Sequence, residues 1–509
     1  MSLRTRFVSA LVLASAVALV PATALGQPQT ATYDVPNTHV SYDDAIVGIA
    51  DADIPKAGPT GLRMWVVTPD GYSADRCWPV LYLLHGSGTA NEWSDVANYT
   101  HGLPAVIVIP GGGDSQYSNW FNGGKRAPRW EDWFFQDVMS TVAKNYNICP
   151  QRSQHAIAGT SMGGAGAMYL ASQRPDYFGA AGAFSGVPLN LGSPIIQLGF
   201  NMFGQVWGPA NGFYAQGHDS TTLVKNLRWT RVFLGLGNGE PYDATDVDPG
   251  QGHIVEVVAG LQAADFAPAA RKAGVKVTVQ KHQGIHTDRN FQDSLARMIA
   301  WNPFAPVTDA PASWTLTTVA QKGDAWGYKY ALAKPPTGLV RLAFSGGRLT
   351  AAGRGRMTVR PPDGGRFTAT LPFAFRDGTV TKLKGAAGDT TTKATKLPVP
   401  LGLDPWHPRR SQPIKVHFKT DRRLKADQEY QVIVRQQTPG CFITNGVRVR
   451  APRKGQVVRL TMAPGRTQGH PANRWCKANG HVHVLVVPRA STGIQLGAYL
   501  GTATFRPRT

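Results

Sequence analysis

The sequence predicts an α/β fold with a mostly parallel sheet, followed by all-β, sandwich-like modules. From residue 61 to residue 302, short apolar runs alternate with segments whose apolar residues recur at helical spacing. Continuous apolar strands separated by helices are typical of a parallel sheet that helices cover on both faces. After about residue 308, helical spacing almost disappears, and short alternating runs between Gly, Pro or Asp turns replace it.

The first 26 residues have the pattern of an export signal. Arg4 and Arg6 precede an apolar run over residues 7–20, and residues 22–24 (ATA) form a small-residue cleavage site. The run is short for a membrane span, so we expect cleavage near residues 24–26, with a retained anchor as the alternative. No later stretch is long and apolar enough to cross a bilayer. We therefore expect a secreted, extracellular or cell-wall-associated protein with no transmembrane segment after signal removal.

The predicted catalytic domain covers residues 27–307. Its strands are expected at 62–68, 80–84, 105–109, 155–158, 180–184, 232–236 and 276–280, and its helices at 130–146, 164–171, 254–271 and 289–300. Ligands of such a sheet bind at the carboxyl ends of the strands. Residues 185–230 are irregular and rich in bulky apolar side chains. We expect this insertion either to form a lid or acyl-binding wall or to pack against the domain.

The rest of the chain is predicted to form two β-rich modules, residues 308–398 and residues 399–509. Strands of the first are expected at 314–319, 339–344, 356–360 and 367–371. Strands of the second are expected at 414–418, 430–434, 447–449, 457–462, 482–487 and 499–505.

Charge is distributed unevenly along the 509 residues, whose formal net charge is +21. Residues 311–509 hold 33 Lys or Arg and 8 Asp or Glu, a balance of +25, and the first 310 residues hold the remaining 20 and 24, a balance of −4. This split indicates two regions with different roles. Outside the cell, the basic region suits anionic wall polymers or lipid head groups. No motif favours nucleic acid, and simple solubility is the alternative reading.

The four cysteines suit two disulfides in an oxidising compartment. Cys77 precedes the strand at 80–84, and Cys149 precedes the strand at 155–158. Neighbouring parallel strands would bring these two starts together, so we expect the pairs Cys77–Cys149 and Cys441–Cys476. The spacings do not indicate a zinc site, and no pattern indicates a cofactor or another metal.

The strongest functional motif is the pentapeptide GTSMG, residues 159–163. It lies between an apolar strand and a small-residue helix, which is the context of the nucleophile elbow in α/β-hydrolases. With 56 Gly in the chain, the pentapeptide alone is weak evidence. The context predicts that Ser161 is a nucleophile raised at a helix N-terminus, where developing negative charge is stabilised.

A serine nucleophile needs a base and an acid, in the chain order Ser, acid, His. His286 lies in a Gly-containing loop after the last strand and is the expected base, with His282 as its competitor. Position along the chain does not decide among five candidate acids, which are Glu240, Asp243, Asp246, Asp248 and Glu256.

Two backbone N–H groups are needed to stabilise the oxyanion. The first is expected from Met162, directly after the nucleophile. The second is expected from Ser87, in the turn HGSG that follows the strand at 80–84. An ordinary Gly turn is the alternative there.

Residues 62–302 resemble the esterase D-type family of esterases, in its mycolyltransferase (antigen 85 complex) branch. The matching segments are PVLYLLHG (79–86), VIPGGGDSQYSNWF (108–121), the elbow, LGNGEP (236–241) and Gly-x-His at 284–286. Glu256, with Phe266 after it, has the spacing of the family's catalytic Glu. The resemblance therefore implies Glu256 as the acid, with Asp243 next.

Two departures concern the mouth of the site. The family's transferases carry an acidic residue where this chain has His85, and Ser-Trp where this chain has Thr287-Asp288. The sequence thus predicts a serine esterase or acyltransferase that cleaves a lipid or acyl-sugar ester and passes the acyl group to water or to a sugar or glycerol hydroxyl. The alternative is a non-catalytic surface-binding protein on a hydrolase scaffold.

Overall fold

The computed structural model describes residues 29–36, 39–40, 62–87, 96, 100, 102–113, 115–121, 128–193, 196, 206–208, 212–246, 252–376, 379–383, 402–404, 409, 411–419, 429–438, 441–450, 457–463, 475, 482–490, 493–494 and 501–505. The expected export signal and Asp248 lie outside these residues.

An eight-stranded sheet forms the body of the first domain, in the order β1-β2-β4-β3-β5-β6-β7-β8. The strands are β1 (Thr30–Asp34), β2 (Arg63–Val67), β3 (Val80–Leu84), β4 (Val106–Pro110), β5 (His155–Thr160), β6 (Ala180–Phe184), β7 (Arg231–Gly237) and β8 (Val277–His282). Each strand from β4 across the sheet to β8 pairs in parallel with its neighbour. The pairs β1–β2 and β2–β4 are antiparallel. The sheet is therefore mostly parallel, as predicted, and β1 is an addition that the sequence did not indicate.

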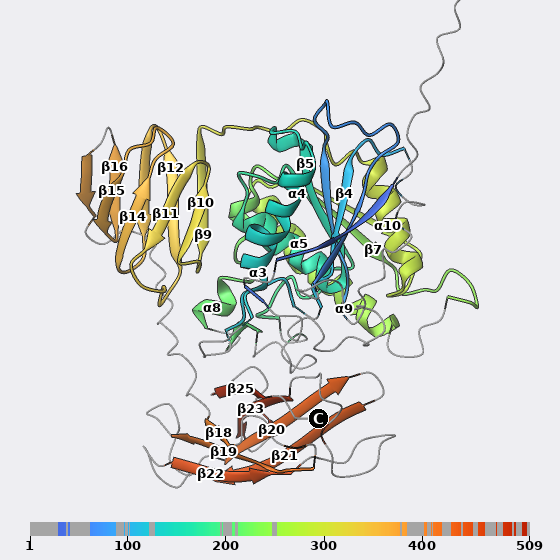
Figure 1. Cartoon of the computed structure of the whole chain (residues 1–509), viewed down its shortest axis with the longest axis vertical. Coiled ribbons are helices and arrows are strands. Elements are labelled where there is room, and N and C mark those ends of the chain that lie inside the picture. The colour runs from blue at the N-terminus through green and yellow to red at the C-terminus, as the bar shows by residue number, and fades with distance from the viewer. Residues whose placement is uncertain are drawn as a thin grey trace, which may run out of the picture.

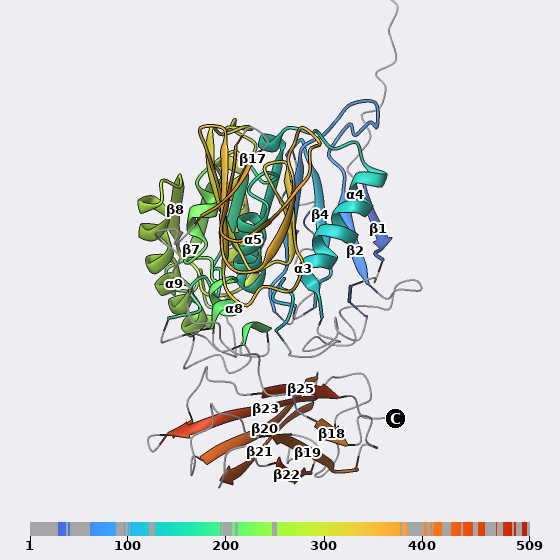
Figure 2. The same cartoon turned by 90° about the vertical axis from the view of Figure 1, so that its left-hand side faces the viewer.

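Helices cover both faces of this sheet (Figures 1 and 2). One face carries α3 (Trp130–Asp132), a π-helical segment (Trp133–Val138), α4 (Met139–Asn145), α5 (Ser161–Gln173) and α9 (Gly252–Lys272), and the other carries α10 (Asp288–Ala300). Strand β3 shows why both faces must be covered. Val80, Tyr82 and Leu84 enter the core under α5, whereas Leu81 and Leu83 enter the core under α10.

The described part of the predicted insertion includes α8 (Phe213–Gln216) and a 3₁₀ segment at Val224–Leu227. Trp207 and Phe213 are buried, so this part packs against the domain. Phe200, Met202 and Phe203 lie outside the described residues.

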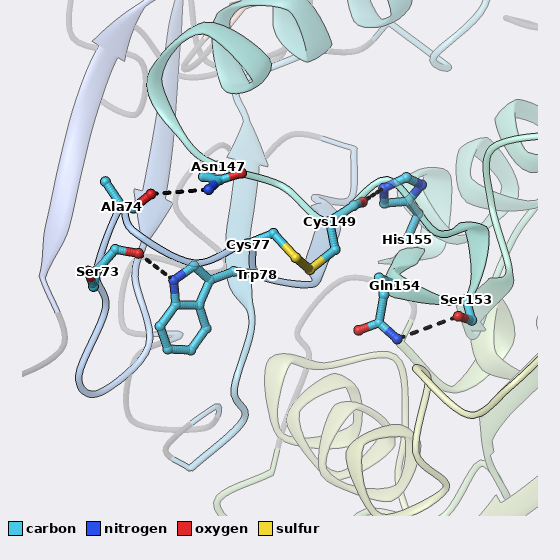
Figure 3. Close-up of a disulfide and its surroundings, with 9 residues drawn as sticks. All are labelled: Ser73, Ala74, Cys77, Trp78, Asn147, Cys149, Ser153, Gln154 and His155. Carbon is cyan, nitrogen blue, oxygen red and sulfur yellow. Dashed lines mark hydrogen bonds between the residues drawn. A yellow bond between two sulfur atoms is a disulfide. The ribbon is translucent and has the colours of Figure 1, made fainter.

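A disulfide joins Cys77 to Cys149, which is the predicted pairing (Figure 3). The reason is the one expected from the sequence, since β3 and β5 are parallel neighbours with Val80 opposite His155. The carbonyl of Cys149 also accepts a 2.6 Å hydrogen bond from Nε2 of His155. The disulfide thus links the amino ends of two central strands.

The first β-rich region is a two-sheet sandwich beside α5. One sheet has the order β17-β16-β13-β12-β9 and the other β10-β11-β14-β15. Their bounds are β9 (Ser313–Thr318), β10 (Lys322–Ala325), β11 (Tyr328–Leu332), β12 (Val340–Ser345), β13 (Arg348–Ala352), β14 (Arg356–Arg360), β15 (Phe367–Thr370), β16 (Phe373–Arg376) and β17 (Thr379–Lys382). The two sheets enclose one apolar core. Strands β10, β11, β13, β16 and β17 were not predicted.

The second β-rich region contains β18 (Gly402–Asp404), β19 (Ile414–Lys419), β20 (Glu429–Thr438), β21 (Cys441–Arg450), β22 (Val457–Met462), β23 (Val482–Ala490), β24 (Gly493–Ile494) and β25 (Gly501–Phe505). The strands that are described there pair antiparallel, as in a β-sandwich. Cys476 lies outside the described residues, so the pair Cys441–Cys476 stays a prediction. Among the described residues, no helix has the length and apolar character needed to span a membrane.

Candidate active site

The turn between β5 and α5 explains the spacing of the GTSMG motif. Ser161 is the first residue of α5 and has a φ of 49°, a conformation that side-chain-bearing residues rarely adopt. A Cβ atom on Gly159 or on Gly163 would clash with the Leu84 carbonyl oxygen. Both positions therefore require glycine. Ser161 is partly exposed, whereas the remaining residues of α5 are buried.

The turn after β3 is held by the buried ring of His85. The Gly112 N–H donates to Nε2 at 2.9 Å, so Nε2 carries no proton and Nδ1 donates to the Gly86 carbonyl at 2.7 Å. Burial lowers the pKa of His85 to about 4, which keeps the ring neutral. The ring joins the HGSG turn to the Gly-rich loop after β4.

Both predicted oxyanion donors lie at the same edge of the sheet. Ser87 belongs to the turn after β3. Met162 follows Ser161 at the start of α5, the helix that comes after the neighbouring strand β5. Leu84, at the end of β3, pairs with Gly159 near the end of β5. The Ser87 side chain is exposed and the Met162 side chain is buried.

His286 follows β8 and is hydrogen-bonded to Glu256 on α9. Its Nδ1 lies 3.0 Å from Oε2 of Glu256, whose side chain is fully buried. The His286 backbone N–H donates to the Gly252 carbonyl at 3.2 Å, and its ring meets the Phe291 ring edge-on with centroids 5.0 Å apart. Nε2 is buried and has no hydrogen-bond partner in the part of the chain that is described. Because Nδ1 faces a carboxylate, the proton belongs there and Nε2 keeps its lone pair.

The other candidate acids have different partners. Asp243 is exposed and forms an ion pair with Arg289, with 2.6 Å between Oδ2 and Nη1. Asp246 accepts hydrogen bonds from the Tyr242 N–H and the Thr287 hydroxyl, and Glu240 accepts one from the Asn238 side chain. Of the four described candidates, only Glu256 is hydrogen-bonded to His286.

The competing histidine belongs to another cluster. Nε2 of His282 lies 2.9 Å from the Ser294 hydroxyl, and its Nδ1 lies 3.1 Å from the Tyr242 hydroxyl and 3.2 Å from a carboxylate oxygen of Asp293. Both ring nitrogens of His282 are thus occupied, which is the opposite of the arrangement at His286.

Ser185 is a site residue that sequence reasoning missed. It follows β6, has a φ of 49°, and donates its hydroxyl to Oε1 of Glu256 at 2.8 Å. The same oxygen accepts the Gly237 N–H at 2.6 Å, and the Asn290 amide donates to the Ser185 hydroxyl at 3.2 Å. Its position in the sequence could have indicated a site residue, because Ser185 directly follows β6, as Ser161 directly follows β5.

The arrangement brings residues from four neighbouring strands to one edge. Ser161 follows β5, Ser185 follows β6, Glu256 lies on the helix after β7, and His286 follows β8. A backbone hydrogen bond of 3.1 Å from Val187 to the Ser161 carbonyl ties the first two loops together. The described residues contain no group of three or more His, Cys, Asp or Glu side chains arranged to hold a metal ion.

Comparison with known proteins agrees with this geometry. Residues 60–302 match the family described as Putative esterase. The chain is 31% identical over 193 residues to a Mycobacterium tuberculosis esterase, covering 34% of this chain and 42% of that protein. It is 30% identical over 183 residues to the diacylglycerol acyltransferase/mycolyltransferase Ag85C of Mycobacterium leprae, covering 32% and 54%. The chain thus spans about half, or less, of the length of these relatives.

Among solved structures, Mycobacterium tuberculosis MPT51 is similar with a TM-score of 0.40 and 20% identity, covering 54% of this chain and 99% of that chain. A ferulic acid esterase is similar with a TM-score of 0.38 and 20% identity, covering 55% of this chain and 98% of that chain. The site geometry and the family match concern the same segment, from the strand before the HGSG turn to the helix after His286. Residues 60–302 thus match the Putative esterase family, and the relatives that this segment resembles include an esterase and a mycolyltransferase.

Proposed function

We propose that residues 60–302 catalyse cleavage of a carboxylic ester through an acyl-enzyme on Ser161. The Ser161 hydroxyl attacks the ester carbonyl while Nε2 of His286 takes its proton, and Glu256 orients the imidazole and stabilises the imidazolium. The Met162 and Ser87 N–H groups stabilise the oxyanion. His286 then returns the proton to the leaving alcohol. The acyl-enzyme is resolved by water or by a second alcohol, which loses its proton to Nε2 of His286 as it attacks the acyl carbonyl. His286 then returns this proton to Ser161 as the bond between Ser161 and the acyl group breaks.

One observation carries this proposal. Nδ1 of His286 is hydrogen-bonded to a buried carboxylate, while its buried Nε2 has no partner among the described residues. An unpaired buried nitrogen costs free energy, about 1–3 kcal/mol, unless a hydrogen-bond partner arrives. A nucleophile or substrate hydroxyl is such a partner.

The proposal is tested by replacing the nucleophile. Ser161→Ala should abolish both hydrolysis of p-nitrophenyl esters and labelling by a fluorophosphonate. Ser345→Ala removes an exposed serine of β12 and should leave both unchanged. Labelling that survives in Ser161→Ala would overturn the assignment of the nucleophile.

The acceptor of the acyl group is proposed to be water or a sugar or glycerol hydroxyl. The relatives include diacylglycerol acyltransferase/mycolyltransferases, which supports an alcohol acceptor. Two positions differ from the family's transferases, His85 and Thr287-Asp288, and this argues against a trehalose acceptor. Incubating the acylated enzyme with trehalose or glycerol and analysing for an ester product distinguishes transfer from hydrolysis.

A second role is proposed for the basic region, because residues 311–509 have a charge balance of +25 from 33 Lys or Arg and 8 Asp or Glu. We propose that the protein is exported, that residues 1–26 are removed, and that the modules at 308–398 and 399–509 hold it at anionic wall polymers or lipid head groups. In the alternative function, this binding is the whole role and the hydrolase scaffold is inactive. Amino-terminal sequencing of the secreted form tests export, and loss of wall-fragment binding as salt rises tests attachment.

A further inference from the structure

The first β-sandwich is docked on the α/β domain by buried hydrogen bonds. The Asn226 side chain donates to the Thr317 carbonyl and accepts from the Thr317 N–H, both at 2.8 Å. The Thr318 hydroxyl donates to Oε1 of Gln173 at 2.8 Å, at the end of α5. All these side chains are buried. The sandwich is therefore held in one orientation relative to the helix that begins at Ser161.

One face of this sandwich is strongly basic. In the sheet β10-β11-β14-β15, alternate residues such as Tyr330, Met357 and Val359 enter the core, and the residues between them point outward. The exposed outward side chains include four cations, Lys322, Lys329, Arg356 and Arg360. We name this surface, together with its outward threonines, the basic face.

The register places like charges opposite each other on the basic face. Lys329 on β11 is paired directly with Arg360 on β14, an arrangement that is unfavourable in an isolated sheet. Asp324 on β10 is opposite Lys329 and is the one acidic residue on these four strands. Among the described residues, no ion pair involves any of the four cations. The face therefore has an uncompensated charge of +3, from four cations and Asp324.

The other outward side chains of the basic face are Asp324, threonines and Ala331. Thr358 and Thr368 are paired across the strands with their hydroxyls 3.4 Å apart, and Thr370 is opposite Arg356. The large apolar side chains that are exposed in the described part of the chain lie on α9, β17 and β22, so none is on this face. Its outward side chains also include no aromatic ring. A bilayer would need apolar anchors, and single-stranded nucleic acid would need stacking platforms.

We propose that the basic face binds an anionic polysaccharide. Arginine and lysine supply charge-assisted hydrogen bonds to its acidic groups, and the threonine hydroxyls supply hydrogen bonds to its sugar hydroxyls. The chain of sugars lies across β11 and β14, where Lys329 and Arg360 adjoin. This deepens the proposed attachment of the basic region by locating it on one sheet, and it does not rest on the ester chemistry.

The test uses the whole protein and immobilised polygalacturonate. The variant Lys329→Gln/Arg360→Gln removes two adjacent cations of the basic face. The matched control, Arg348→Gln/Lys382→Gln, removes two exposed cations of the other sheet and changes the net charge equally. We expect wild type and control to bind equally, more weakly as salt rises from 20 to 500 mM, and the face variant to bind about tenfold more weakly or worse.

Three results would overturn the proposal. Equal losses in both variants would mean that net charge alone governs binding, and wild-type binding by the face variant would exclude this surface. Equal or tighter binding to phosphatidylglycerol vesicles or to single-stranded DNA would identify another partner class. Hydrolysis of a soluble p-nitrophenyl ester, which should be the same in all three proteins, reports on folding and on the esterase proposal separately.

Discussion

Glu256 lies 3.0 Å from Nδ1 of His286 through one carboxylate oxygen, and its other oxygen accepts hydrogen bonds from Ser185 and from the Gly237 backbone. Three elements, the loop after β6, the end of β7 and the loop after β8, therefore converge on one buried carboxylate. An acid held on both oxygens can keep the imidazole in one orientation and one tautomer. Each of these contacts can be removed separately.

Replacing Glu256 and Asp243 in separate variants distinguishes the two strongest candidates for the acid that orients His286. Glu256→Gln should lower kcat by about 10²- to 10⁴-fold, because the amide cannot stabilise the imidazolium and can favour the wrong tautomer. Asp243→Asn should leave kcat nearly unchanged, since Asp243 is exposed and paired with Arg289. Steady-state kinetics on a p-nitrophenyl ester measures both. A larger loss in Asp243→Asn would assign the acid to Asp243.

Ser185 is expected to act as a positioning residue. Ser185→Ala removes one of the two donors to Oε1 of Glu256 and should lower kcat about 10- to 100-fold with little change in KM, because small misplacement of the base is costly. Ser294→Ala is the matched control, since that buried hydroxyl contacts His282 instead. A rise in KM with constant kcat would mean that Ser185 serves substrate binding and not positioning.

His85 should make the protein sensitive to mild acid. Its folded-state pKa is about 4, below the usual 6.5, so the unfolded chain binds more protons between these values. Its contribution to stability is present above pH 6.5 and is lost as pH falls toward 4. His85→Ala should lower the Tm at pH 7, because it leaves the Gly112 N–H and the Gly86 carbonyl unpaired, but its Tm should fall less than that of wild type from pH 6.5 to 4.5. Parallel Tm curves would contradict this.

Glu131 should have the opposite effect on the alkaline side. It is buried beside Tyr169, whose hydroxyl donates to it at 2.8 Å, and burial raises its pKa to about 8. The folded protein therefore binds more protons between pH 4.5 and 8, and stability falls as pH rises through this range. Glu131→Gln keeps an acceptor for Tyr169 without titrating, so its Tm should fall less than that of wild type between pH 6 and 9. Glu240→Gln, at an exposed position, should follow wild type.

Much of the α/β domain could be predicted because its central strands are buried on both faces and read as short apolar runs. Strand β6 has the predicted bounds, and β3 and the elbow strand lie where expected. Strands β1, β10 and β17 were missed for the opposite reason. They are edge or outer strands with mixed polarity, such as TVTK in β17, and are defined by their pairing partners more than by their own residues.

What the sequence determined by itself was local. Ser161 stands out because a tight turn needs Gly159 and Gly163 within a few residues of it, and His286 because it follows the last strand. The partner of His286 was decided only by tertiary structure. Glu256 is 30 residues away from His286 along the chain and 71 from Ser185, and its neighbours meet only when the helix after β7 packs on the sheet. Sequence proximity favoured none of five carboxylates, whereas packing buries one of them against the imidazole and leaves Asp243 in solvent beside Arg289.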